Sequence, residues 1–176
     1  RLEEICSEVR ASLGDKGAVY VAILNGPSQI VIGGLNAGLD EAIARVKRDG
    51  GRGLKIPVSV PFHCDLMADA AEKFSEILGS VVFGGFGVPV IPNCDPGSFY
   101  SAENARGYLA AQIRSLVKWD ESVRKMLSMG VEWAIEIGPR KVLSGLVRRI
   151  NKEITVVNVE DIESLKKTLK ELKDRT

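Results

Sequence analysis

The chain has 176 residues, of which 45% are hydrophobic and 27% are charged, and its formal net charge is +1. This length and composition are typical of a globular protein with one or two folding units, and they exclude a disordered chain. The near-zero charge gives no electrostatic reason to expect a nucleic-acid partner, and no apolar run approaches the roughly 20 residues that a membrane span needs.

The first residues and the cysteines bear on the location of the protein. The sequence begins with Arg-Leu-Glu-Glu, which lacks the pattern of a secretory signal, so we expect a cytoplasmic protein without a membrane partner. Cys6, Cys64 and Cys94 are odd in number and form no Cys-x-x-Cys pair. Such a set predicts small buried thiols rather than a zinc site.

The first third of the chain alternates between helix and strand patterns. Apolar spacing predicts a helix over residues 2–13 and a hairpin of strands 19–24 and 29–32. It then predicts a helix with apolar residues from Leu39 to Val46 on one face, ending near Gly50-Gly51, and a strand over 54–60. The order α-β-β-α-β is one initial strand short of a ferredoxin-like unit. We therefore expect a sheet that lacks its first strand, and a missing segment upstream.

From Ser59 onward, helices alternate with short apolar strands. This alternation predicts an α/β layer with a mainly parallel sheet. Helices are expected over residues 65–78, 102–117, 119–129, 141–151 and 162–173, and strands over residues 81–83, 88–91, 133–137 and 155–159.

His63 is the only histidine and the first candidate for chemistry. It follows the alternating strand and precedes an amphipathic helix, and strand ends are where open α/β sheets gather reactive groups. An imidazole can take and return a proton near neutral pH. Its position alone leaves a structural role and a catalytic role both open.

Gln112 is a polar residue on a helix face that is otherwise directed to the core. A buried amide must find hydrogen-bond partners. Gln112 is therefore either a boundary residue or part of a helix whose polar atoms hold a neighbouring catalytic group.

The nucleophile that such a histidine would serve is not evident. The sequence contains no Gly-x-Ser-x-Gly, so the strained serine elbow of α/β hydrolases is absent. Cys64 is a poor substitute because adjacent side chains usually diverge. The glycine pairs at 33–34 and 50–51 lack phosphate-loop context and indicate turns.

Five segments resemble, in the same order, the motifs of bacterial malonyl-CoA:acyl carrier protein transacylases. Residues 25–34 (Asn-Gly-Pro-Ser-Gln-Ile-Val-Ile-Gly-Gly) are similar to the family's Asn-Ser-Pro-Gly-Gln-x-Val-Ile-x-Gly hairpin. Residues 57–67 (Pro-Val-Ser-Val-Pro-Phe-His-Cys-Asp-Leu-Met) resemble its catalytic-histidine segment, and residues 88–95, 117–119 and 136–143 match further motifs. Together the five segments extend over nearly the whole chain.

The resemblance implies an α/β fold in two parts. Residues 59–176 would form the C-terminal part of an α/β-hydrolase-like large domain, and residues 1–58 a ferredoxin-like small domain without its first strand. The family transfers a malonyl group from coenzyme A to the phosphopantetheine thiol of acyl carrier protein through an acyl-serine, in fatty acid biosynthesis, with no metal or redox cofactor. The family's serine elbow, oxyanion-hole segment and carboxylate-binding arginine have no counterpart here. We therefore expect this chain to be inactive alone and to need the missing N-terminal portion.

The resemblance implies functional roles for five residues. His63 matches the base that activates the serine, and Gln112 matches the position whose carbonyl orients the imidazole. Asn25 and Asn93 match positions near the cleft between the domains, with turn chemistry as the alternative role. Phe62 is similar to the residue of malonyl-selective acyltransferases that excludes an α-methyl branch.

Three positions depart from the family pattern: Ser28 replaces a glycine, Leu116 a proline, and Arg140 the second glycine of Gly-Pro-Gly-Lys. Arg140 replaces a residue that tolerates a positive φ with one that does so reluctantly. Two alternative functions stay open, a non-catalytic fragment or interaction module, and an acyltransferase of a polyketide pathway.

Overall fold

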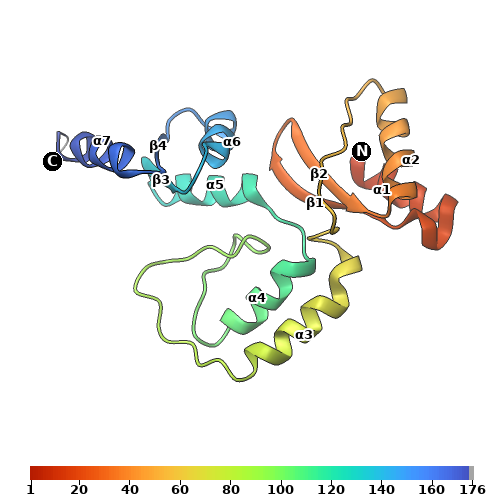
Figure 1. Cartoon of the computed structure of the whole chain (residues 1–176), viewed down its shortest axis with the longest axis horizontal. Coiled ribbons are helices and arrows are strands. Elements are labelled where there is room, and N and C mark those ends of the chain that lie inside the picture. The colour runs from red at the N-terminus through yellow and green to blue at the C-terminus, as the bar shows by residue number, and fades with distance from the viewer. Residues whose placement is uncertain (175–176) are drawn as a thin grey trace. The chain divides into compact units, whose positions relative to one another are not determined.

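The computed structural model describes residues 1–174, and the chain divides into two compact units, residues 1–119 and 120–176 (Figure 1). The predicted domain boundary between residues 58 and 59 stays a prediction. Within the described part of the chain, no helix has the length and apolar character to cross a membrane.

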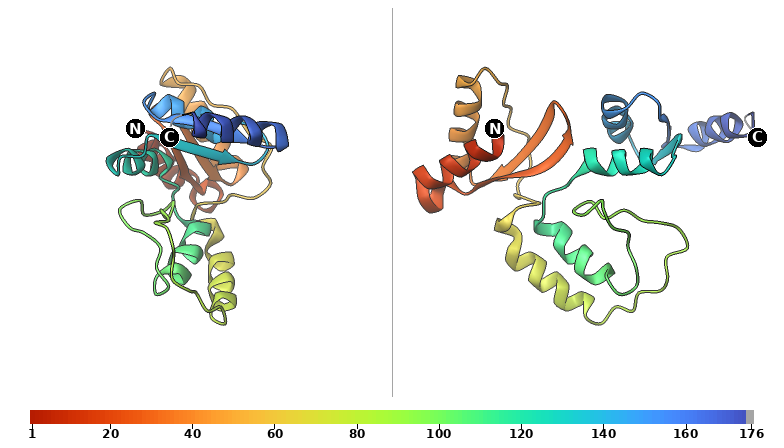
Figure 2. Two further views of the ribbon diagram at one scale, coloured as in Figure 1. Left: turned by 90° about the vertical axis from the view of Figure 1, so that its left-hand side faces the viewer. Right: turned by 180° about the vertical axis from the view of Figure 1, so that it is seen from behind.

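The first unit opens with two helices packed on a hairpin. The order is α1 (Leu2–Leu13), a 3₁₀ turn, β1 (Val19–Gly26), β2 (Gln29–Gly34) and α2 (Asn36–Arg48). The strands pair antiparallel, which confirms the predicted hairpin, and α1 and α2 lie on the same side of it (Figure 2). The core between these elements consists of Ile5, Cys6, Val9, Val19 and Ala42.

The rest of the first unit carries two more helices. A 3₁₀ turn (Asp65–Met67) leads into α3 (Ala68–Leu78), which packs against α4 (Ala105–Arg114). Helix α4 is shorter than the predicted 102–117. It begins later because residues 101–104 form a turn in which Asn104 Oδ1 accepts a hydrogen bond from the Ser101 backbone N–H at 2.7 Å. It ends earlier because Ser115 is extended.

Three predicted strands, over residues 54–60, 81–83 and 88–91, are wrong for the described structure. A strand needs a neighbouring backbone for its N–H and C=O groups. In residues 54–60 the Val58 N–H donates to Ile56 only two residues away, and the Val81 N–H donates to the end of α3 at Leu78. In residues 88–91 the Val90 carbonyl accepts a hydrogen bond from the Tyr100 N–H at 2.9 Å, but no described segment forms a strand ladder with any of the three.

The second unit is a small parallel α/β arrangement. Helix α5 (Trp119–Ser128) leads into β3 (Trp133–Ile137), α6 (Val142–Ile150), β4 (Thr155–Val159) and α7 (Ile162–Lys173). Strands β3 and β4 pair in parallel over five residues each, as the alternating pattern predicted.

Side chains cap both helices that follow these strands. Glu136 accepts hydrogen bonds from the backbone N–H groups of Leu143 and Ser144, at 2.9 and 2.8 Å, at the start of α6. Asp161 and Ser164 form a capping box at the start of α7. These contacts satisfy amide groups that lack partners inside a helix.

Candidate active site

His63 sits in a backbone conformation that side chains seldom adopt. Its φ is 63°, in the left-handed region, and such residues cluster at functional sites when the surroundings hold them in place. Two contacts hold it at the C-terminal end of α4. Its backbone N–H donates to the Ile113 carbonyl at 3.0 Å, and its ring Nδ1 lies 2.7 Å from the Gln112 carbonyl oxygen.

These two carbonyls are available because they belong to the last turn of α4. The last four carbonyls of a helix have no intrahelical partner. The segment at His63 satisfies two of them, so the end of the helix and the histidine fix each other. A carbonyl oxygen can only accept a hydrogen bond, so the contact requires the proton on Nδ1. The neutral ring therefore keeps a free lone pair on Nε2, the form that a general base needs.

Gln112 contacts His63 through its main chain and uses its side chain elsewhere. Its Nε2 donates to the Tyr100 hydroxyl at 2.7 Å, and the Tyr100 ring meets the Tyr108 ring edge-on at 5.7 Å. The Tyr108 hydroxyl donates to Asp95 Oδ2 at 2.7 Å. This polar cluster ties the loop before α4 to the helix that positions His63.

Asp95 is the charged member of that cluster. Hydrogen bonds from the hydroxyls of Tyr108 and Ser98 lower the pKa of its carboxyl below the ordinary value. Reasoning from the sequence did not group Asp95, Tyr100 and Tyr108 with the site. The one available signal was a helix face that carries Tyr108 and Gln112 four residues apart, which places both on one side.

Cys64 and Asp65 secure the histidine segment without joining its chemistry. The buried Cys64 thiol donates to the Pro61 carbonyl at 3.1 Å, and desolvation raises its pKa, which disfavours the nucleophilic thiolate. Asp65 pairs with Arg114 at 2.5 Å at the end of α4.

The structure brings Phe62 next to His63 but places Asn25 and Asn93 differently. The two rings of Phe62 and His63 are 6.3 Å apart, and Phe62 is 49% exposed. Asn25 and Asn93 flank one segment, because Val117 exchanges hydrogen bonds with β1 and the Lys118 N–H donates to the Asn93 carbonyl at 2.8 Å. In the described chain neither asparagine hydrogen-bonds to His63.

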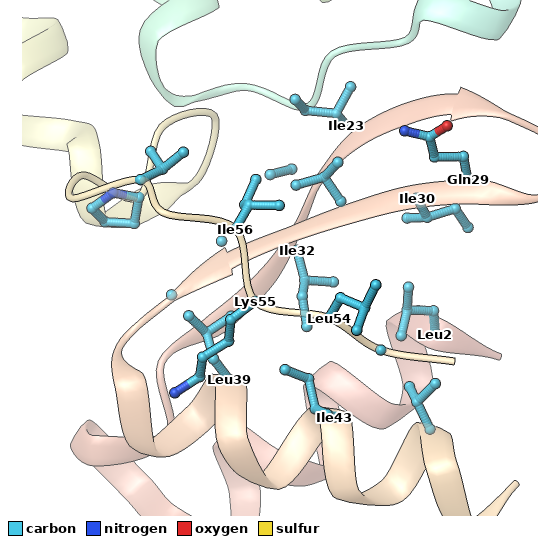
Figure 3. A pocket seen from close by; sticks show the side chains of 18 of the residues that line it. Leu2, Ile23, Gln29, Ile30, Ile32, Leu39, Ile43, Leu54, Lys55 and Ile56 are labelled. Atoms are coloured by element: carbon cyan, nitrogen blue, oxygen red, sulfur yellow. The ribbon is translucent and has the colours of Figure 1, made fainter. Parts of the chain in front are cut away.

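A cavity of about 1420 Å³ lies beside the histidine within the first unit. Strand β2, one face of α2 and most of residues 51–63 line it, and Phe62 and His63 are among the lining residues. Figure 3 shows Ile32, Leu39 and Ile56 among the side chains that surround it. Across residues 1–174, no cluster of three metal-ligating side chains is found.

Comparison with known proteins places this chain in a family. The acyl transferase domain family matches residues 2–175. The malonyl CoA-acyl carrier protein transacylase of Bacillus subtilis is 36% identical over 173 residues, which are 97% of this chain and 55% of that protein. The chain therefore belongs to the acyl transferase domain family, and malonyl CoA-acyl carrier protein transacylases are among the proteins that it resembles.

Solved structures agree with this assignment. The transacylase of Clostridium perfringens is 39% identical with a TM-score of 0.88, over 98% of this chain and 54% of that one. A malonyl-transacylase in complex with its type II polyketide acyl-carrier protein is 34% identical with a TM-score of 0.90, over 97% and 54%. The chain spans about half the length of the relatives it matches.

Proposed function

We propose that this chain is the part of a malonyl-CoA:acyl carrier protein transacylase that supplies the catalytic base, His63. The observation that carries the proposal is the 2.7 Å contact between Nδ1 and the Gln112 carbonyl oxygen, which leaves Nε2 free to take a proton. No serine hydroxyl hydrogen-bonds to His63 among residues 1–174. The nucleophile is therefore assigned to the part of the domain outside this chain.

The proposed reaction has two half-steps that use the same imidazole. In the first, Nε2 takes the serine hydroxyl proton as the serine oxygen bonds to the malonyl thioester carbon, and the departing coenzyme A thiolate takes that proton. In the second, Nε2 takes the proton of the phosphopantetheine thiol as the thiol sulfur attacks the carbonyl carbon of the malonyl-serine ester. The departing serine oxygen then takes that proton from Nε2. Both steps need one ring nitrogen with a free lone pair, and the contact between Nδ1 and the Gln112 carbonyl leaves Nε2 in that form.

The remaining assignments follow the same proposal. Phe62 borders the acyl site, and Asn25 and Asn93 lie near the cleft between a ferredoxin-like small domain (residues 1–58) and the α/β-hydrolase-like part (residues 59–176). Malonyl-CoA and acyl carrier protein are the proposed substrates because the matched relatives carry those names and one was crystallised with its carrier protein. We place the reaction in the cytoplasm, in fatty acid biosynthesis.

The test compares two substitutions of His63 in the complete enzyme. His63→Ala removes the base, and His63→Asn also removes it but keeps a residue that tolerates positive φ and can donate to the Gln112 carbonyl. We expect both to lower the rate of malonyl transfer by about 10²- to 10⁴-fold. His63→Asn should unfold at the same urea concentration as the wild type, whereas His63→Ala loses the contact to Gln112 and should unfold at a lower one. Near-normal turnover of His63→Asn refutes the role.

The competing function is a non-catalytic module, because the chain has no serine elbow. Incubation of this chain alone with malonyl-CoA, followed by mass spectrometry of the intact protein, separates the two cases. Under our proposal the mass stays unchanged until the rest of the domain is added, and then a malonyl adduct forms there. If no adduct forms with the complete domain, the module is the better description.

A further inference from the structure

We propose that Tyr100 is a positioning residue for His63. Its hydroxyl holds the side-chain amide of Gln112 and so fixes the last turn of α4, whose carbonyls orient the imidazole. The inference deepens the proposed function and rests on it, because the orientation of the ring affects turnover only if His63 is the base. Three observations lead to it: an end of α4 that needs support from outside the helix, a loop that holds Tyr100 in place independently, and a hydroxyl that stays neutral.

The first observation is that the last turn of α4 has little support of its own. The helix has ten residues, fewer than the roughly 12–15 that an isolated helix needs in water, and helix ends fray. The chain becomes extended at Ser115, directly after the helix. The Gln112 and Ile113 carbonyls, which bind His63, lie in this last turn. Their positions therefore depend on contacts that hold the turn from outside.

Contacts reach this turn from two sides. On one side is the histidine segment itself, through His63 and through Asp65, whose Oδ1 lies 2.5 Å from Arg114 Nη2. These contacts move with the segment that is being oriented, so they cannot serve as its fixed reference. On the other side, Gln112 Nε2 donates to the Tyr100 hydroxyl oxygen at 2.7 Å. This hydrogen bond joins the turn to the loop before α4, which is separate from the histidine segment.

The second observation is that the loop before α4 holds Tyr100 in place by contacts of its own. The Tyr100 N–H donates to the Val90 carbonyl at 2.9 Å, and its ring stacks on Phe86 with the centroids 5.8 Å apart. The preceding residue, Phe99, is fixed by Asn104, whose Nδ2 donates to the Phe99 carbonyl at 2.9 Å. None of these contacts involves the last turn of α4 or the histidine segment. Tyr100 is therefore a fixed point against which the end of α4 is held.

The third observation concerns the chemistry of the Tyr100 hydroxyl. Desolvation raises the pKa of Tyr100, so the hydroxyl is neutral at physiological pH and accepts the amide hydrogen bond without carrying a charge. Tyr100 and Gln112 are both half-buried, and water replaces a lost partner incompletely at such a position. A phenylalanine at position 100 keeps the ring contacts but cannot accept the hydrogen bond. The removal of one oxygen atom therefore releases the Gln112 amide and loosens the turn that holds His63.

The first test measures the His63 ring in the chain as it is. The Nδ1–H proton exchanges with water only when its contact to the Gln112 carbonyl opens, and proton NMR measures this rate for the single histidine. Tyr100→Phe should speed the exchange about 2- to 12-fold, which is the factor that the loss of one ordinary hydrogen bond corresponds to. An unchanged rate overturns the proposal.

Ser98→Ala is the matched control. It also removes one hydroxyl from the same loop, because the Ser98 hydroxyl donates to Asp95 Oδ2 at 2.7 Å, but it leaves the contact between Tyr100 and Gln112 intact. It should lower the urea midpoint of unfolding about as much as Tyr100→Phe does and leave the Nδ1–H exchange at the wild-type rate. Equal acceleration by both substitutions refutes the positioning role, since a general loosening of the loop would then be the cause.

A second substitution shows whether Tyr100 acts through Gln112. Gln112→Met removes the side-chain amide but keeps the main-chain carbonyl and a good helix former of similar length. It should speed the exchange as Tyr100→Phe does. The double variant should exchange no faster than either single variant, because both substitutions break the same contact. Effects that multiply in the double variant would show that Tyr100 does not act through this amide, and the proposal would be wrong.

Kinetics of the complete enzyme separate this inference from the proposed function. Tyr100→Phe should lower kcat and kcat/KM for malonyl-CoA equally, by about 2- to 12-fold, because the orientation of the ring matters in the transition state. Ser98→Ala should keep the wild-type kcat. If His63→Asn turns over normally, the assignment of the base fails, whatever the exchange rates are. If His63→Asn is inactive and Tyr100→Phe keeps the wild-type kcat, only the positioning role fails.

Discussion

The ring Nδ1 of His63 lies 2.7 Å from the backbone carbonyl oxygen of Gln112, so the main chain of α4 orients the imidazole. A main-chain acceptor at a helix end is rigid, because the preceding turns of the helix fix its position. The Gln112 side chain is left to bind Tyr100, which ties the helix to the loop before it. The main-chain carbonyl of Gln112 therefore orients His63, while its side-chain amide binds Tyr100.

This contact predicts a single tautomer for His63. We expect the neutral ring to carry its proton on Nδ1, because the Gln112 carbonyl can only accept. Nitrogen-15 NMR of the histidine-labelled chain measures this directly, and the assignment is unambiguous because the chain has one histidine. The same chain in concentrated urea, where the contact is lost, is the reference. A folded state with the proton on Nε2 would contradict the proposed base.

Asp95 should make the stability of the first unit depend on acid pH. Hydrogen bonds from Tyr108 and Ser98 lower the folded-state pKa of its carboxyl, whereas the unfolded chain has the ordinary value of about 3.9. The stabilisation is therefore fully present above the unfolded pKa and is lost as the pH falls through the lower folded pKa. Asp95→Asn should unfold at a lower urea concentration than the wild type at pH 7. The difference between the two urea midpoints should narrow as the pH falls below about 4. Glu72→Gln, the same acid-to-amide substitution at an exposed residue, is the control. A difference in urea midpoint for Asp95→Asn that stays constant with pH would contradict the prediction.

Much of the local structure could be predicted because it depends on local pattern. The hairpin 19–34 and the parallel pair β3–β4 follow from alternation and turn residues. The strands predicted over 54–60, 81–83 and 88–91 did not form, because a strand also requires a partner that a local pattern cannot supply. At the site, the sequence identified His63 and Gln112 as candidate functional residues. It could not assign the Gln112 side chain to Tyr100, because that pairing depends on how the loop returns to α4.

Arg140 should be a site of local strain in the second unit. The resemblance flagged it as an arginine in place of glycine, and its φ is 70°. Its N–H donates to Glu160 at 3.0 Å and its carbonyl accepts from Asn158 at 2.8 Å, and glycine would keep both because they use backbone atoms. We expect Arg140→Gly to raise the free energy of unfolding of this unit by about 0.5–1 kcal/mol.

The measurement can follow Trp133, which lies in β3 of the same unit, in a Trp119→Phe background. Arg140→Ala is the matched control, since it removes the same long side chain but keeps a Cβ in the left-handed region. An equal gain from Arg140→Ala would place the effect in the side chain rather than in the backbone.

Phe62 should set the choice between malonyl and methylmalonyl groups in the complete enzyme. The Phe62 ring lies beside that of His63, and the residue is 49% exposed, so its removal costs the fold little. Under the proposed function, the removal opens space next to the reacting thioester. One steric contact is worth about 1–3 kcal/mol of discrimination. Phe62→Ser should therefore raise kcat/KM for methylmalonyl-CoA relative to malonyl-CoA by about 10- to 200-fold, measured with the two thioesters in competition. Phe86→Ser removes a ring of similar exposure, 41%, that stacks on Tyr100 instead, and its ratio should stay at the wild-type value. If both variants shift the ratio equally, the selectivity does not come from the ring beside the histidine.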